Sequence, residues 1–597
     1  MPAYTAPLRD MRFVFHELHQ GAEIADLPGF EEMTADLIDP VLEEAGKFAS
    51  EVLAPLNLSG DVEGCSFENG VVRTPKGFKQ AYDLFRQGGW TGTACDPAFG
   101  GQGLPVAVNT LVQEMISSAN LSFGMYPGLT HGAYKAIHAH ADTALKETYL
   151  PKLVDGSWAG TMCLTEPHCG TDLGLMRTRA IPQPDGSYHV SGTKIFISSG
   201  EHDLTENIIH LVLARLPEAP SGIKGISLFV VPKFPVREDG KLGARNGAAC
   251  GAIEHKMGIK ASATCVLNFD DATGWLVGEP HKGMRAMFTM MNAARLGVAV
   301  QGIGVAEASY QGAVAYARER LQGRSLSGAK YPDKPADPLL VHPDIRRMLL
   351  TMRANIEGAR ALGVWAAKAL DIQSNSPDPA ARQDAEDLVA LLTPVLKACF
   401  TDLGFEAANL GVQIYGGHGY IRDHGMEQLV RDARITQIYE GANGVQALDL
   451  VGRKMPAHAG RLLRQFFHPV AAFVALHGED DDGLGSFAQG LGKAFGRLQQ
   501  ATLRIAQIGQ AKPDEAGAAA TDYLRLFGLV AMAYMWARMV QLALPKVAAD
   551  QDPTGFYKAK IATARFFFDR MLPESGARLS AILAGGKSMS EFDDALF

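Results

Sequence analysis

The sequence predicts an α+β multidomain protein in which helical segments flank a central block of short β-strands. Its 597 residues exceed one domain at roughly 150 residues per domain, so about three to four domains are expected. Hydrophobic residues make up 47% and charged residues 20%, an ordinary globular balance that argues against a disordered chain or a coiled-coil rod. The apolar spacing changes along the chain from helical to strand-like and back. These observations favour helices, then strands, then two further helical regions.

The first part of the chain has helical periodicity. Apolar residues recur every three or four positions from Glu32 to Leu53, and Pro55 is expected to end this helix. A second helix is expected over Gly77 to Gln87. The glycines of the stretch 96–105 suggest a phosphate loop, but no strand precedes them, so an ordinary loop is favoured.

Short β-branched and aromatic runs follow Trp158, each bounded by Gly, Pro or Asp. They cover Tyr188 to Ser198, Asn207 to Arg215, Gly225 to Lys233 and Thr264 to Phe269. Regular short strands of this kind predict a small antiparallel barrel or sandwich.

Helices return after about Lys282 and continue to the end of the chain. Pro343, directly after His342, is expected to open one of them, because proline at the first helical position gives up an N–H that has no partner there. We therefore expect four domains. They are a helical domain with an N-terminal extension at residues 1–157, a β domain at 158–280, a helical domain at 281–455 and an additional helical domain at 456–597.

Charge and cysteine content limit the classes of function. Lys and Arg number 56 and Asp and Glu 65, giving a net charge of −9, which argues against a surface built for nucleic acid. Seven cysteines without CxxC spacing do not indicate a disulfide framework or a structural zinc site. The first ten residues lack an apolar signal region, and the apolar run Leu526 to Ala537 is shorter than a membrane span. A soluble, cytoplasmic protein with no integral membrane segment is expected.

The first candidate motif, Met162 to Gly174, stands where the strands begin. Thr165 and Thr171 offer hydroxyl groups, and Gly170 lets backbone N–H groups approach an anion.

The same motif offers metal ligands as an alternative. Cys163, His168 and Cys169 are of the right types, but a consecutive His and Cys with one distant Cys gives poor tetrahedral geometry. No metal is therefore expected.

The second motif, Lys194 to Gly200, is an alternating strand that ends in small polar residues. Phe196 is most simply a core aromatic, and it could equally form a wall for a flat ring with Ser198 at the ring edge. Both interpretations stay open.

The third motif contains Glu440, which follows Ile438 and Tyr439 and precedes Gly441. A carboxylate in apolar surroundings has a raised pKa, which suits it to take a proton from carbon. Taken alone, a Glu before Gly is usually only a residue at a helix end.

Together the three motifs, in this order on a helix-strand-helix layout, resemble the acyl-CoA dehydrogenase family of flavoenzymes. The resemblance covers roughly residues 35 to 455. It rests on Cys163 to Pro167 with Gly170 to Asp172, and on Gln437 to Gly441. Cys169 and Leu175 replace small residues that are usual in the family. The resemblance implies an enzyme that binds FAD in the domain at 281–455 and oxidises an acyl-CoA to the trans-2-enoyl-CoA.

The resemblance also implies catalytic roles. Glu440 matches the base that removes the α-proton while the β-carbon gives hydride to N5 of FAD, with base and flavin on opposite faces of the substrate. The N–H of Glu440 matches a donor to the thioester carbonyl. A minority of relatives carry the base at the position of Ala294, whose methyl group cannot accept a proton.

Binding residues carry over in the same way. The cofactor positions are Met162, Cys163, Leu164, Thr165, Gly170, Thr171, Phe196, Ser198, Arg320, Gln413, Gly416 and Gly417. Arg320 and the last three match contacts to the FAD of a neighbouring subunit. The substrate positions are Thr171, Asn292, Arg295, Tyr439 and Gly441. Ala442 and Gly444 replace the usual Thr and Gln.

Residues 456–597 resemble the extra domain of larger bacterial relatives, among them broad fatty acyl-CoA enzymes and 3-methylmercaptopropionyl-CoA dehydrogenases. That domain could cover the surface where a second dimer docks, so a homodimer is expected, with electron-transfer flavoprotein as the electron acceptor.

A DNA-damage-response flavoprotein of the same fold is the rival function. Residues 456–597 hold 15 Lys and Arg against 14 Asp and Glu, without the cationic cluster that DNA binding needs. Lipid contact through residues 526–535 is a second rival, which a buried helix explains more simply.

Gly124 and Gly128 suggest room for medium or longer acyl groups.

Overall fold

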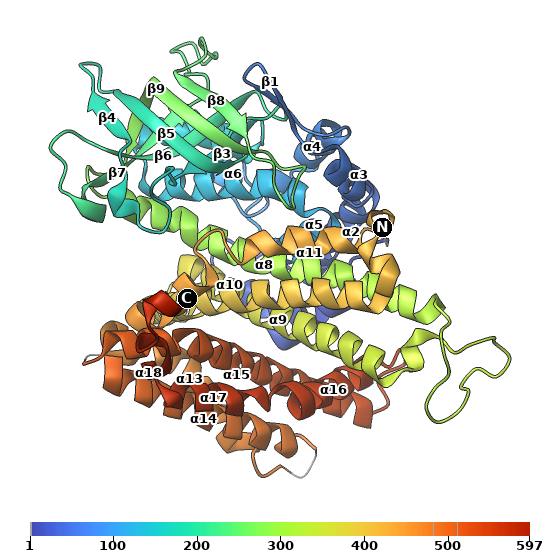
Figure 1. Ribbon diagram of the computed structural model, residues 1–597. Helices are drawn as coiled ribbons and strands as arrows, with labels where there is room; N and C mark the ends of the chain where they lie inside the picture. Colours follow the sequence, from blue (N-terminus) through green and yellow to red (C-terminus); the bar gives the residue numbers. More distant parts are fainter. Residues whose placement is uncertain (1–2, 481–482, 510) are drawn as a thin grey trace. The chain divides into compact units, whose positions relative to one another are not determined.

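The computed structural model describes residues 3–480, 483–509 and 511–597 (Figure 1). The chain divides into two compact units. The first, here the helical unit, comprises Met1–Gly46, Pro105–Ser118 and Val298–Phe597, and the second, the β unit, comprises Lys47–Leu104 and Ala119–Gly297. Each predicted site motif lies wholly within one unit.

The β unit contains a closed barrel. Its strands are β3 (Trp158–Cys163), β4 (Arg179–Pro182), β5 (Tyr188–Ser198), β6 (Asn207–Arg215), β7 (Ile226–Pro232), β8 (Ala248–Ile253) and β9 (Thr264–Val277). The order β6-β4-β5-β9-β7 returns to β6. β3 pairs with residues 207–212 of β6, β4 meets β6 only at Arg215, and β8 pairs with β9. The predicted strands are confirmed. The purely antiparallel arrangement is wrong in one respect, because β6 pairs in parallel with both β3 and β4.

Side-chain alternation along β6 divides the apolar core of the β unit into two layers. Leu211 and Leu213 pack in one cluster with residues of α6 (Leu121–His140) and α7 (Thr143–Val154). Val212 and Ala214 point to the opposite face and pack inside the barrel. A strand buried on both faces reads as the continuous apolar run seen in the sequence.

The helices of the β unit begin at recognisable caps. Asn120 accepts a hydrogen bond from the N–H of Phe123 at 3.0 Å, and Asp142 accepts one from Leu145 at 2.9 Å. The other elements here are α3 (Pro55–Glu63), α4 (Phe78–Gln87), β1 (Ser66–Glu68) and β2 (Val71–Arg73). The predicted helix at 32–53 is found as α2 (Ala35–Phe48), most of which belongs to the helical unit, and a π-helical turn at Ala49–Leu53 in the β unit. Pro55 does not stop the helical path as predicted, because it occupies the first turn of α3.

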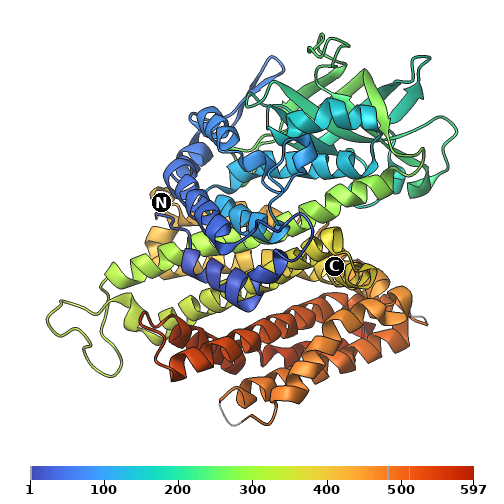
Figure 2. The ribbon, with the colours of Figure 1, turned by 180° about the vertical axis from the view of Figure 1, so that it is seen from behind.

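The helical unit is built from long helices that lie beside one another (Figures 1 and 2). Their bounds are α1 (Leu8–Arg12), α5 (Val106–Ala119), α8 (Gly283–Glu319, whose first part belongs to the β unit), α9 (Pro343–Asn375), α10 (Pro379–Tyr415), α11 (Met426–Thr436), α12 (Asn443–Asp449), α13 (Arg461–His477), α14 (Gly485–Gly509), α15 (Pro513–Ala548), α16 (Phe556–Phe566), α17 (Glu574–Ala584) and α18 (Lys587–Ser590). Pro343 opens α9 as predicted.

A buried ionic cluster joins distant parts of the helical unit. The Arg360 guanidinium contacts the carboxylates of Asp10, Glu114 and Glu307, the last at 2.7 Å. Lys560 contacts Asp10 and also Glu357, the latter at 2.7 Å. Since Asp10 lies near the start of the chain and Lys560 near its end, the N-terminal segment and the C-terminal helices form one packed body.

Among the residues that the structure describes, two helices are long and apolar enough to cross a membrane by length and composition. They are the helix at Pro379–Tyr420 and α15, and 67% and 78% of their most apolar stretches are buried inside the chain. The 12-residue run noted in the sequence is therefore part of a longer apolar helix. Core helices of soluble proteins have the same character.

Candidate functional site

The first two predicted motifs lie side by side in the β unit. The carbonyl oxygen of Thr165 accepts a hydrogen bond from the N–H of Ile195 at 2.9 Å. The Lys194 ammonium donates to the carbonyl oxygen of Leu164 at 3.0 Å and to Glu166 Oε1 at 2.9 Å. Both side chains of this ion pair are almost fully buried. The pair therefore fixes the loop after β3 against β5.

Glu166 is held as a carboxylate by several partners. Burial acts to raise its pKa, but the charge of Lys194 and hydrogen bonds from Thr178 and the N–H of Arg177 lower the pKa below its ordinary value. Burial raises the pKa of the neighbouring Cys163 thiol to about 12. The motif thus contains an ionised acid and an unreactive thiol.

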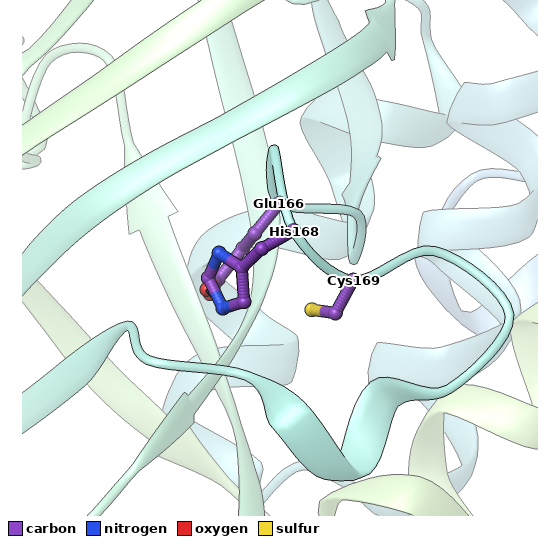
Figure 3. A group of neighbouring side chains, drawn as sticks. All are labelled: Glu166, His168 and Cys169. Atoms are coloured by element: carbon purple, nitrogen blue, oxygen red, sulfur yellow. Dashed lines mark ion pairs between the residues drawn. The ribbon is translucent and has the colours of Figure 1, made fainter.

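Glu166, His168 and Cys169 lie within 4.8 Å of one another and could be considered as metal ligands. Figure 3 shows the side chains of Glu166 and His168 close together, with the Cys169 sulfur directed toward them from the other side of the loop. Glu166 is already neutralised by Lys194, and His168 Nε2 lies 3.0 Å from the carbonyl oxygen of Leu175. Burial also raises the pKa of the Cys169 thiol, which disfavours the thiolate that a metal requires. These contacts favour a structural role for the three residues.

Phe196 stands out at the end of β5. It has φ +58° and is 60% exposed, and the register between β5 and β9 shifts at this point. A β-bulge places its extra residue outside the ladder, so the ring points away from the core. The interpretation of Phe196 as a core aromatic is therefore wrong. A flat ligand can stack against an exposed aromatic ring. The Phe196 ring, with Ser198 at the end of the same strand, offers such a surface.

Four further predicted residues of the β unit lie in two places. Asn292 and Arg295 lie together on α8, where Arg295 Nη1 donates to Asn292 Oδ1 at 3.3 Å. Gly170 and Thr171 are exposed on the loop after β3. A Cβ added at Gly170 would meet only the Thr165 methyl, at 3.8 Å, so packing inside the chain does not require glycine there.

Glu440 lies in the helical unit, in the loop between α11 and α12. Its φ is +57°, an uncommon value for a residue with a side chain, and Gly441 follows with φ +88°. The side chain is half-buried. Strain of this kind persists only where the surroundings hold the backbone in place.

A buried lysine holds that loop. Lys397 of α10 is fully buried and donates to the carbonyl oxygen of Gly441 at 2.8 Å and to Asn443 Oδ1 at 2.9 Å. Asn443 in turn donates to Asp402 at 2.8 Å, and Gln446 donates to the carbonyl oxygens of Glu440 and Gly441, both at 3.3 Å. The loop that carries Glu440 is therefore fixed at its backbone by these hydrogen bonds, and the Glu440 residue as a whole is half-buried.

Tyr439, a predicted substrate residue, forms one wall of this loop. Its hydroxyl donates to Gln301 Oε1 on α8. Burial, followed by the charge of Glu440, raises the pKa of Tyr439, so the hydroxyl stays protonated.

Arg320, Gln413, Gly416 and Gly417 gather at another end of the helical unit. The rings of Tyr316 and Tyr415 stack with centroids 4.1 Å apart, which joins the ends of α8 and α10. Arg320 follows α8, and Gly416 and Gly417 follow α10; all four predicted residues are exposed. Apart from the residues that flank each glycine in sequence, no residue in the described part of the chain lies within 4 Å of a Cβ added at either glycine.

Comparisons with known proteins match four family models along the chain. They are the acyl-CoA dehydrogenase N-terminal domain at residues 39–157, the middle domain at 161–272, the C-terminal domain at 281–455 and the acetyl-CoA dehydrogenase C-terminal like domain at 466–593. The 3-methylmercaptopropionyl-CoA dehydrogenase of Ruegeria pomeroyi is 43% identical over 98% of this chain and 99% of its own length. The chain belongs to the acyl-CoA dehydrogenase family. The resemblance noted in the sequence is thereby confirmed, and the protein is an FAD-dependent acyl-CoA dehydrogenase.

Two further relatives support the family and its fold. The broad-specificity linear acyl-CoA dehydrogenase of Mycobacterium tuberculosis is 33% identical, with the whole of both chains covered. An acyl-CoA dehydrogenase of Bacillus anthracis, solved with FAD, has a TM-score of 0.73 at 20% identity and covers 94% of this chain and 90% of its own. At this identity the likeness shows the fold, with its β domain and extra helices.

The residues of the β unit fit an acyl-CoA dehydrogenase cofactor. The exposed Phe196 ring offers a face for an isoalloxazine, and Ser198 lies at the edge of the same strand. Gly170 leaves open space beside Thr165 for a phosphate group. The Phe196 ring and the space at Gly170 are both accessible to a ligand.

The sequence analysis assigned no function to several residues that the structure places at these sites. Glu166 belongs to the first motif and Lys194 to the second, but no sequence pattern predicted that these two residues form an ion pair. Lys397 was missed altogether. A lone lysine within the apolar stretch 388–400 was the available signal, because a fully buried lysine needs several acceptors.

Proposed function

We propose that Glu440 is the base that removes the α-proton of an acyl-CoA in this enzyme. Bound FAD supplies the acceptor for the hydride that leaves the β-carbon. The observation that carries the proposal is the loop itself, in which Lys397 and Gln446 hold the strained backbone of a half-buried Glu440. A carboxylate carried on a fixed backbone is the arrangement that positions a general base.

The N–H of Glu440 is proposed to donate to the thioester carbonyl, where negative charge develops as the proton leaves. Tyr439 and Gly441 flank the acyl group, and Thr171, Asn292 and Arg295 contact the CoA portion. The reaction requires Glu440 and the flavin ring on opposite faces of the substrate.

Cofactor binding is assigned to two groups of residues, one in each unit. Met162, Cys163, Leu164, Thr165, Phe196 and Ser198 border the ring, and Gly170 and Thr171 approach the diphosphate. Arg320, Gln413, Gly416 and Gly417 contact the cofactor of a second copy. The assignment of these last four residues is supported by their exposure in the single chain, since a surface that meets a second copy must be accessible.

The substrate is an acyl-CoA thioester, and 3-methylmercaptopropionyl-CoA is the first candidate among them. The support is the 43% identity over nearly the full chain to a relative of that name, against 33% to the broad-specificity enzyme.

An anaerobic panel tests both proposals. Acyl-CoAs from C4 to C16 and the methylmercapto analogue are mixed with the holoenzyme, and bleaching of the flavin absorbance is recorded. Glu440→Gln should slow bleaching by about 10²–10⁴-fold with FAD still bound. Glu591→Gln, on the exposed end of the chain, is the control and should bleach normally. Normal bleaching by Glu440→Gln would exclude it as the base.

Further proposals concern assembly and location. Electron-transfer flavoprotein is proposed as acceptor, tested by reduction of the purified partner. A homodimer is proposed, tested by light scattering, with the domain division given above. A cytoplasmic enzyme free of lipid is proposed, tested by cell fractionation and vesicle flotation.

A further inference from the structure

Two arginines of the β unit have no role in the site described above. Arg177 and Arg179 flank Thr178 at the start of β4. Residues two apart on a strand share a face, so both guanidinium groups project to the same side and Thr178 points inward. Thr178 is buried and donates to Glu166 Oε1 at 2.5 Å, while both arginines are exposed.

The neighbouring strand completes a hollow on that face. Arg179 pairs with Ser191 of β5, and continuing the register sets Arg177 beside Thr193. Together with Glu166 and His168, these four residues line a pocket of about 320 Å³. Figure 3 shows Glu166 and His168 on one side of their loop, and both belong to this lining.

Glycine is required for the pocket to have this shape. A Cβ at Gly192 would come within 2.4 Å of Thr178 Oγ1, so only glycine lets β5 approach Thr178 this closely. The approach brings the two arginines and the β5 residues to one hollow.

The charges around the pocket leave it with a net positive charge. Glu166 is its acid, and Lys194 already neutralises that carboxylate at 2.9 Å. The nearby Asp271 accepts a hydrogen bond from Ser191 Oγ at 2.7 Å. Over residues 3–480, 483–509 and 511–597, neither the Arg177 nor the Arg179 guanidinium has an ion pair or hydrogen bond. Two cations with unused donors therefore face a space large enough for a small polar group.

We propose that this pocket binds a phosphate monoester through Arg177 and Arg179. Planar guanidinium groups bind phosphate oxygens in pairs, and two of them match a doubly charged monoester. Ser191 and Thr193 already donate to Asp271 and Asn268, so the arginines supply the donors. The phosphate comes either from the 3′-phosphate of the CoA thioester, which rests on the proposed function, or from a free nucleotide.

Binding to the FAD-loaded enzyme without turnover tests the proposal. Isothermal titration uses 3′,5′-ADP and inorganic phosphate, with adenosine as the ligand without phosphate. The double variant Arg177→Gln with Arg179→Gln should weaken 3′,5′-ADP binding about tenfold or more at low salt and leave adenosine unchanged. Arg179→Lys should keep part of the affinity. Arg237→Gln is the matched control, because Arg237 is exposed in the same unit and pairs only with a surface acid, Asp239, at 3.5 Å.

A second measurement separates the two sources. The affinities of an acyl-CoA and of its 3′-dephospho form are measured from the change in flavin absorbance. If the double variant weakens only the form with the 3′-phosphate, the pocket serves the substrate. If both thioesters bind as before while 3′,5′-ADP binding falls, it serves a free nucleotide. Either result supports the proposal.

Two results would overturn it. Wild type and double variant binding 3′,5′-ADP and phosphate equally would show that the arginines bind no phosphate. Loss of FAD from the double variant would assign the pocket to the cofactor. Neither depends on Glu440, so retained bleaching in Glu440→Gln would refute the proposed base and leave the phosphate result standing.

Discussion

Phe196 in the β unit and Glu440 in the helical unit share a strained backbone but are held in different ways. Their φ values are +58° and +57°. Phe196 is the extra residue of a β-bulge, two positions after the buried Lys194, whereas Glu440 lies in a loop that the buried Lys397 reaches from another helix. Strained positions of this kind cost about 1–3 kcal/mol each. In the helical unit the buried lysine bonds to the strained loop itself, whereas Lys194 bonds to the loop after β3 and the strain at Phe196 goes with the bulge.

The largest expected effect is on the β unit. Lys194→Met leaves the Glu166 carboxylate buried without its cation, and breaking such a pair costs about 3–5 kcal/mol. We expect a lower melting temperature and weaker FAD retention, measured by thermal melting and flavin fluorescence. Lys587→Met is the control, because Lys587 is exposed and makes only a surface pair. A variant that melts like wild type would show that Lys194 does not hold the motif.

The same variant should show a distinct pH dependence. The folded-state pKa of Glu166 is lowered, so its stabilisation is full above the unfolded value of about 4.3 and is lost as the pH falls through the folded pKa. Protonation removes the unpaired charge in the variant. The difference in melting temperature from wild type should therefore be largest near neutral pH and should shrink on acidification. A constant difference would exclude the ion pair as its cause.

A smaller effect is expected in the helical unit. Lys397→Met removes the donors to the Gly441 carbonyl and Asn443 Oδ1, which costs about 1–3 kcal/mol. Because the loop carries Glu440, the turnover number should fall while the KM changes little, as steady-state kinetics can measure. Reduced stability with an unchanged turnover number would limit Lys397 to a structural role.

The sequence predicted the elements and the motifs better than the contacts between them. β-branched and aromatic runs located β5, β6, β7 and the first part of β9, and the runs were clearest in β6 and β7, which are buried on both faces; β8 was not predicted. The runs could not reveal the parallel pairing of β3 with β6, which depends on which distant strands meet. Glu440 was found through its motif. Its left-handed backbone depends on Lys397, more than 40 residues away in sequence, and local pattern carries no sign of that bond.

Phe196 permits a direct test of backbone strain in the β unit. Phe196→Gly and Phe196→Ala both remove the ring, but only glycine adopts φ +58° without strain. The glycine variant should be more stable than the alanine variant by about 1–2 kcal/mol. Both should lose FAD affinity equally if the ring is the wall for the flavin, as fluorescence titration would show. Equal stability would mean that the bulge relaxes when the ring is removed.

The smallest effect on stability is expected at Gly170, and it separates ligand binding from folding. Gly170→Ala meets only the Thr165 methyl at 3.8 Å and has no positive φ to oppose it, so stability should stay the same or rise by up to about 1 kcal/mol. FAD affinity should nevertheless fall several-fold, because the new methyl occupies the space assigned to the diphosphate. Gly441→Ala is the matched contrast. Its φ of +88° makes alanine strained, so stability should fall by about 1–2 kcal/mol while FAD affinity is kept. Equal FAD affinity of wild type and Gly170→Ala would show that the diphosphate does not occupy the space beside Gly170.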